Sequence, residues 1–182
     1  MTISEDRLRG GIEGVLIGDA FGVPYEFHPP EQLPPRDALD FEPPPGFARA
    51  HASVMAGTWS DDGAQALCLL ASLLEHDRLD VPDLAERMVR WYQQGYLAVD
   101  ADVFDIGIAT RTALAAIARG VDPLAAARCD EMSNGNGALM RVLPLALWHR
   151  GSDAELVSDA HLQTRITHGH PRSAVCSALY CL

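Results

Sequence analysis

The spacing of hydrophobic residues predicts a chain built almost entirely of helices. Residues 6–21 carry apolar side chains three or four positions apart, as one face of an α-helix requires. The same period recurs in the ranges 60–74, 80–95, 105–120 and 137–150, and again from residues 152 and 171 onward. No segment shows the convincing alternation of apolar and polar residues that is typical of a half-buried strand. The pattern therefore predicts an all-α fold.

Capping residues support several of these helices. Ser60 and Asp80 precede two of the apolar stretches, and Ser152 with Glu155 has the pattern of a capping box. Asp122 followed by a proline is a favourable start for a further, short helix. These signals assign four of the predicted helix starts to a specific residue.

A proline-rich stretch, residues 27–57, interrupts the helical pattern. Seven prolines fall within it, and proline is excluded from helix interiors. A loop of this length inside a compact domain is usually either functional or disordered. We expect it to form a lid or a wall beside the site.

The length and charge of the chain narrow the classes of protein. The 182 residues fit a single domain, 1–182, and the formal net charge of −11 disfavours nucleic acid as a partner. No apolar run reaches the roughly 18 residues that a spanning helix needs, so no membrane association is expected. The N-terminal stretch MTISEDRLRG is not followed by the apolar core of a secretory signal, and we expect a cytoplasmic protein.

Two groups of acidic residues are candidates for chemistry. The stretch GDAFGVPYE carries Asp19 and Glu26 at the end of a glycine-rich helix, although a solvated helix end gives the same pattern. Ser60, Asp61 and Asp62 stand together at the start of the next helix. A hydroxyl and two carboxylates suit Mg²⁺ or a similar hard cation, and they are also typical of an ordinary helix cap.

A third candidate is the stretch SNGNG, residues 133–137, which precedes a predicted helix. Asn-Gly pairs tolerate positive φ angles and expose backbone N–H groups, which suits a phosphate cradle at a helix N-terminus. Asn-Gly pairs also form plain turns, and this stretch by itself leaves both interpretations open.

Five stretches, taken together and in order, resemble the ADP-ribosylglycohydrolase family: GVLIGDAFGVPYE, GTWSDDGAQAL, FDIGIATRTAL, SNGNGALMRVLPLAL and THGHP. They extend from the first predicted helix to Pro171 and cover most of the chain. The resemblance implies an orthogonal multi-helix bundle with a two-metal centre of Mg²⁺ or Mn²⁺. It also implies hydrolysis of the N- or O-glycosidic bond of ADP-ribose attached to a protein or a small molecule.

The resemblance implies roles for individual residues. Ser60, Asp61 and Asp62 are similar to the family's first group of metal ligands. Glu26 is similar to the acid that approaches the metals and the reacting centre, so Glu26 and Asp62 are the expected catalytic residues. The residues expected to bind ADP-ribose, with its diphosphate on the loop 134–139, are Asp105, Asn134, Gly135, Asn136, Gly137, Ala138, Leu139 and His168.

Two departures from the family pattern bear on activity. Ile108 stands where the family usually has Asn after Asp-Ile-Gly, which concerns the choice of substrate. The Asp-x-Asp-Thr/Ser motif that completes the family's metal centre does not occur after Pro171, and the apolar pattern continues to the last residue. We therefore expect an N-terminal portion of the fold, incomplete at its C-terminus, with a C-terminal segment or a second chain completing the site.

Two alternatives to a protein-directed hydrolase remain open at this point. One is a catalytically inactive ADP-ribose-binding or structural relative that lacks the C-terminal metal ligands. The other is a related metal-dependent hydrolase acting on free ADP-ribose derivatives. The expected partner in the main interpretation is ADP-ribose or an ADP-ribosylated protein.

Overall fold

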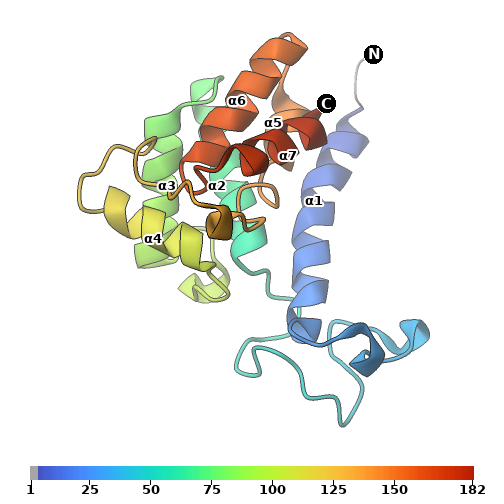
Figure 1. The fold of residues 1–182 in the computed structure, drawn as a ribbon. Coiled ribbons are helices and arrows are strands. Elements are labelled where there is room, and N and C mark those ends of the chain that lie inside the picture. The colour runs from blue at the N-terminus through green and yellow to red at the C-terminus, as the bar shows by residue number, and fades with distance from the viewer. Residues whose placement is uncertain (1–3) are drawn as a thin grey trace.

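The computed structural model describes residues 4–182 of the chain. This range contains seven α-helices, joined by loops and short 3-10 turns (Figure 1). No strand occurs within this range, which confirms the all-α prediction. None of these helices is both long and apolar enough to cross a membrane. The helices are α1 (Glu5–Gly22), α2 (Asp61–His76), α3 (Val81–Gln94), α4 (Ile108–Ile117), α5 (Leu143–Trp148), α6 (Asp153–Arg165) and α7 (Pro171–Cys181).

Helix α2 lies at the centre of the bundle and contacts α1, α3 and α5 (Figure 1). Helices α6 and α7 pack against each other, and α3 also contacts α4. Because α2 is covered on several sides, its first turn has a fixed place in the molecule. The core between α2 and α3 includes the buried side chains of Leu69, Leu73, Leu84, Met88 and Trp91.

Two of the predicted caps form as expected. The Asp80 side chain accepts a hydrogen bond from the Asp83 backbone N–H at 3.1 Å, at the start of α3. Ser152 and Glu155 form the reciprocal pair of a capping box at the start of α6. Helix α3 ends at Gly95, whose φ of 68° lies in the left-handed region that favours glycine.

Three of the predicted helices differ from the structure. The prediction of a helix after Asp122 is wrong, and a turn forms there instead. The Asp122 carboxylate closes this turn by accepting a hydrogen bond from the Leu124 backbone N–H at 2.8 Å. Helix α4 begins at Ile108 rather than at Asp105, whose φ of 54° is incompatible with a right-handed helix. The predicted helix 137–150 is reduced to α5, and tight turns precede it.

The proline-rich residues 27–57 form no α-helix, as their prolines require. They lie at the C-terminal end of α1 and contain the short 3-10 turns Pro30–Gln32 and Arg36–Ala38 (Figure 1). The Ala50 backbone N–H donates to the Pro24 carbonyl at 2.9 Å, which brings the last part of the segment back beside the end of α1.

Candidate active site

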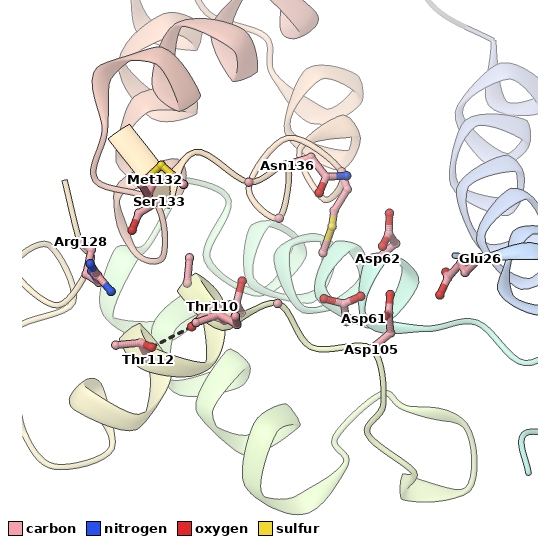
Figure 2. A pocket seen from close by; sticks show the side chains of 16 residues that line it. Glu26, Asp61, Asp62, Asp105, Thr110, Thr112, Arg128, Met132, Ser133 and Asn136 are labelled. Carbon is pink, nitrogen blue, oxygen red and sulfur yellow. Dashed lines mark hydrogen bonds between the residues drawn. The ribbon is translucent and has the colours of Figure 1, made fainter. Parts of the chain in front are cut away.

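A cavity of about 590 Å³ lies where the start of α2, the start of α4 and the loop before α5 meet. Its lining is acidic at one end and is formed by loop residues and a single arginine at the other (Figure 2). None of residues 27–57 is among the lining residues, so the proline-rich segment does not form the expected wall of this cavity. The residues that line it include Glu26, Asp61, Asp62, Asp105, Ile108, Thr110, Arg128, Met132, Ser133, Gly135, Asn136 and Gly137.

Four carboxylates meet at the acidic end of the cavity (Figure 2). Asp61 and Asp62 occupy the first turn of α2, and Glu26 follows the 3-10 turn after α1. Asp105 precedes α4. The sequence motifs that carried these residues are separated along the chain, and the fold brings them to one place.

The pKa values at this end show that negative charge is concentrated there. Burial, together with the neighbouring Asp62 and Asp105 carboxylates, raises the pKa of Asp61 to about 9. Burial and the charges of Asp19 and Glu26 raise the pKa of Asp62 to about 6. The pKa of Glu26 is raised by burial as well, although a hydrogen bond from a histidine opposes that shift.

Asp19, near the end of α1, holds the start of α2 at this end of the cavity. Its carboxylate accepts hydrogen bonds from the Ser60 backbone N–H at 2.9 Å, the Ser60 hydroxyl at 2.7 Å and the Gly63 backbone N–H at 2.7 Å. A side chain of α1 therefore caps α2, and the Ser60 hydroxyl, which was expected to do so, donates to Asp19 instead. Ser60 is buried directly before Asp61 but does not line the cavity.

His51 is a member of the acidic cluster that the sequence motifs did not reveal. Its Nε2 lies 2.7 Å from Glu26 Oε2 and 3.8 Å from Asp105 Oδ1. The ligand atoms of these three residues all lie within 4.8 Å of one another, which is compatible with a metal ion. No local pattern marks His51, because it stands in an irregular segment far from either partner in the sequence.

The loop end of the cavity contains part of the predicted diphosphate loop. Gly135, Asn136 and Gly137 line the cavity, and within residues 4–182 their backbone N–H groups donate to no backbone carbonyl. The other predicted loop residues are not in the lining. The Asn134 side-chain amide donates to the Glu131 carbonyl at 2.9 Å, Ala138 is buried and Leu139 packs against the core. Two further lining residues, Arg128 and Met132, lie outside the sequence motifs, whereas Thr110 and Ser133 lie within them without having been assigned a role.

His168 lies beneath the loop rather than in the cavity lining. Its side chain is 2% exposed, and its Nδ1 lies 2.9 Å from the Thr167 hydroxyl. A Cβ atom added to Gly137 would lie 2.9 Å from His168 Cε1 and 3.0 Å from Thr110 Oγ1, so this position needs glycine for close packing. Burial and the charge of Arg141 lower the pKa of His168 to about 4, and the imidazole is neutral at pH 7.

Arg141 ties the loop to three other elements and is completely buried. Its guanidinium donates to the Gly137 carbonyl at 2.9 Å, to Thr167 Oγ1 at 2.9 Å and to Gln65 Oε1 at 3.0 Å. Gln163 accepts two further hydrogen bonds, through its side-chain oxygen and its carbonyl. Gln65 in turn donates to Asp61 Oδ2 at 3.0 Å, so a buried network joins the two ends of the cavity.

Comparison with known proteins finds one family throughout. The sequence model of the ADP-ribosylglycohydrolase family matches residues 1–182. The ADP-ribosylarginine hydrolase Tri1 of Serratia proteamaculans is 33% identical over 178 residues, which cover 97% of this chain and 46% of that protein. The ADP-ribosyl-[dinitrogen reductase] glycohydrolase of Rhodospirillum rubrum is 30% identical over 183 residues, covering 96% of this chain and 55% of that protein.

A solved structure described as an ADP-ribosylglycohydrolase-related protein complex has the same fold. It superposes with a TM-score of 0.67 at 31% identity and covers 97% of this chain and 54% of that chain. The chain thus spans about half the length of the relatives it matches.

Proposed function

Because the chain belongs to the ADP-ribosylglycohydrolase family, we propose that it provides the active-site half of a cation-dependent hydrolase. The bond cleaved is the N- or O-glycosidic bond of ADP-ribose attached to a protein or a small molecule. One observation carries this proposal: a single cavity has clustered carboxylates at one end and the loop SNGNG at the other. ADP-ribose needs both environments, one at its reacting ribose and one at its diphosphate.

The acidic end fits a divalent cation. Four carboxylates line it, and burial and mutual repulsion raise the pKa of Asp61 and Asp62, so their negative charge is poorly compensated by protein groups. Carboxylate and hydroxyl oxygens are the ligands that Mg²⁺ and Mn²⁺ prefer. Ser60, Asp61 and Asp62 would hold the cation. When bound, it supplies positive charge to the vicinal ribose hydroxyls and favours attack by water near neutral pH.

Glu26 and Asp62 are the acid–base groups in this proposal. A carboxylate with a pKa near neutrality accepts a proton from attacking water and can return it to the leaving group. Asp62 lines the acidic end of the cavity, where that water would be held. Glu26 faces the same space from the end of α1 and shares with Asp105 the task of orienting the substrate (Figure 2).

The loop end supports binding of the diphosphate. The backbone N–H groups of Gly135, Asn136 and Gly137 are donors for phosphate oxygens. Arg128 adds a positive charge at the same end of the cavity. Asn134, Ala138, Leu139 and His168 would act indirectly by fixing the shape of the loop, because none of them lines the cavity.

The partner in this proposal is ADP-ribose or an ADP-ribosylated protein. The net charge of −11 disfavours a nucleic acid. Since the chain spans about half the length of its relatives, a C-terminal segment or a second chain that adds further acidic ligands is part of the proposal. Ile108, which is 80% exposed at the cavity, is the position at which we expect the choice of linkage to be influenced.

The test removes the two aspartates together. In D61A/D62A we expect the rise in Tm caused by Mn²⁺ or Mg²⁺ to disappear and release of ADP-ribose from an arginine-linked or O-linked peptide to stop. The matched control E31A/D37A removes two exposed acids of the proline-rich segment, and its response to Mn²⁺ should equal that of the wild type. Both effects are measured by thermal unfolding and by product analysis.

The outcomes separate the proposal from its alternatives. Unchanged Mn²⁺ binding in D61A/D62A would contradict the assignment of the metal ligands. Cation-dependent binding of ADP-ribose without hydrolysis of any linked substrate, even with the completing segment or second chain present, would identify an inactive binding relative. Hydrolysis of free ADP-ribose derivatives alone would identify the related small-molecule hydrolase.

A further inference from the structure

An imidazole stands between two of the cavity's carboxylates. His51 Nε2 lies 2.7 Å from Glu26 Oε2 and 3.8 Å from Asp105 Oδ1, and the His51 side chain is 16% exposed. The three residues come from separate parts of the chain: the end of the 3-10 turn after α1, the proline-rich segment and the run before α4. A carboxylate only accepts hydrogen bonds, so the proton of this contact is on His51 Nε2.

Aromatic rings on two sides fix the orientation of this imidazole. The Phe27 ring centroid is 5.6 Å from that of His51, and the Phe104 ring centroid is 5.0 Å from it. Both rings are tilted relative to the imidazole, at distances typical of favourable aromatic pairs. Phe27 directly follows Glu26, and Phe104 directly precedes Asp105, so the same short segments hold both the carboxylates and the imidazole.

The backbone at this point adopts an unfavourable conformation in three places. Phe27, His51 and Asp105 have φ angles of 63°, 47° and 54°, and none of them is glycine. Such a conformation is unfavourable for a non-glycine residue and persists where surrounding contacts impose it. The Phe27 side chain is 81% exposed, so burial of its ring does not explain its conformation. All three of these residues lie at or next to the contact between His51 and Glu26.

We infer that His51 is a positioning residue for the hydrolysis, an inference that rests on the proposed function. Its Nε2–H donates to Glu26 Oε2 and holds that carboxylate in one orientation, and Oε1 remains the oxygen available for proton transfer. Asp105 Oδ1 lies 3.8 Å from the same nitrogen, beyond hydrogen-bond distance, so the orienting contact is the one with Glu26. The proline-rich segment thus contributes to the site through one side chain and not as a wall.

The experiment compares the full chain with the variants H51A, H51Q and H51N. The side-chain amide nitrogen of Gln reaches about as far as imidazole Nε2, whereas that of Asn reaches only as far as Nδ1. With Mn²⁺ and a linked ADP-ribosyl peptide, we expect H51A and H51N to lower kcat about tenfold to a hundredfold, with KM changed less than about threefold. H51Q should recover most of the loss, because it restores a donor at the same place.

A second measurement requires no activity. The unfolding equilibrium constants of the wild type, H51A, E26A and H51A/E26A form a double-mutant cycle. We expect a coupling of about threefold to tenfold between the two positions, as for a typical intramolecular hydrogen bond. If H51A does not fold, the cycle with H51N in its place answers the same question.

His28 is the matched control. It belongs to the same segment, its Nδ1 lies 2.8 Å from the Glu26 backbone carbonyl, and its ring packs against Phe47 at 4.6 Å. It therefore contacts Glu26 without touching the carboxylate, and H28A should change kcat less than about threefold. An equal loss of kcat in H28A and H51A would assign the effect to folding of the segment and overturn the inference.

Three further results would overturn the positioning role of His51. An additive cycle, or a coupled cycle with unchanged kcat in H51A, overturns the positioning role. A loss of Mn²⁺ affinity in H51A that H51Q does not restore makes His51 a direct metal ligand and overturns it as well. If the wild-type chain shows neither Mn²⁺-dependent stabilisation nor hydrolysis, the proposed function itself fails before any His51 variant is compared, and this inference fails with it.

Discussion

At one end of the cavity four carboxylates face one another with His51 as the nearby basic group, whereas at the other end one buried arginine donates to carbonyl, amide and hydroxyl oxygens. The acidic end concentrates charge that raises the pKa of its own members. Behind the loop end, the guanidinium of Arg141 is paired with the Gly137 carbonyl and with oxygens of Gln65, Gln163 and Thr167. The first end therefore gathers groups that repel one another, whereas at the second a buried charge is held by several hydrogen bonds.

This difference assigns separate tasks to the two ends. Uncompensated carboxylates are suited to binding a cation, because a bound cation removes a repulsion that the protein alone leaves in place. A paired network is suited to holding a glycine-containing loop in one shape, because each loop carbonyl that it binds loses its freedom to move. The link between them is Gln65, which accepts from Arg141 and donates to Asp61.

The largest expected effect comes from breaking the network at Arg141. In R141M the acceptors on Gln65, Gly137, Gln163 and Thr167 remain buried without their donor. We expect the free energy of unfolding to fall by about 3–5 kcal/mol, measured by chemical denaturation. The exposed Arg172 supplies the control, R172M, which should stay within about 0.5 kcal/mol of the wild type. A loss below about 1 kcal/mol in R141M would show that the network does not anchor the loop.

At the acidic end we expect the opposite effect on stability: removing a charge there should raise the free energy of unfolding. The pKa of Asp61 in the folded chain is about 9, well above that of an ordinary aspartate, so the folded state binds more protons than the unfolded state between about pH 4 and pH 9. The stability that this proton contributes is complete at acidic pH and is lost as the pH rises through the folded-state value. Without divalent cations, the wild type should therefore become less stable from pH 5 to pH 9.

The variant D61N tests this reversal. The neutral amide removes the repulsion and can still accept from Gln65, so we expect a smaller pH slope and a stability gain of about 1–2 kcal/mol at pH 8 in EDTA. Mn²⁺ should stabilise the wild type at pH 8 and have little effect on D61N. Denaturation at several pH values measures both. A D61N variant less stable than the wild type at pH 8 would mean that Asp61 supports the fold as a charged group.

Local sequence patterns predicted most of the helices, whereas the roles expected of the acidic residues came from the family resemblance, Asp105 through it alone. Apolar spacing and caps such as Asp80 act over a few residues, and the corresponding helices formed. The helix expected after Asp122 failed for an equally local reason, because a short aspartate side chain can bond to its own neighbouring backbone and form a turn instead. A favourable cap does not exclude that competing turn.

The supporting residues of the site could not be found in this way. Asp19 bonds to Ser60 across 41 positions, His51 to Glu26 across 25, and Arg141 to Gln65 across 76. No short pattern records such contacts, because they depend on how separate segments pack. Asp19 stood out in the sequence only as an acid near the end of a helix, where the helix dipole disfavours it. The structure resolves that conflict, since Asp19 caps the N-terminus of α2.

The smallest expected effect distinguishes two kinds of glycine and so tests whether the loop end is closely packed. A methyl group at Gly137 would press on His168 and Thr110, whereas Gly10 in α1 has no atom within 4 Å of a Cβ position. We expect G137A to lower the free energy of unfolding by about 1–2 kcal/mol through overpacking, and G10A to raise it by about 0.5–1 kcal/mol through helix propensity. Calorimetric titration should also show weaker ADP-ribose binding by G137A and unchanged binding by G10A. If both substitutions stabilise the chain alike, the loop has room to adjust, and its shape is not set by contact with His168.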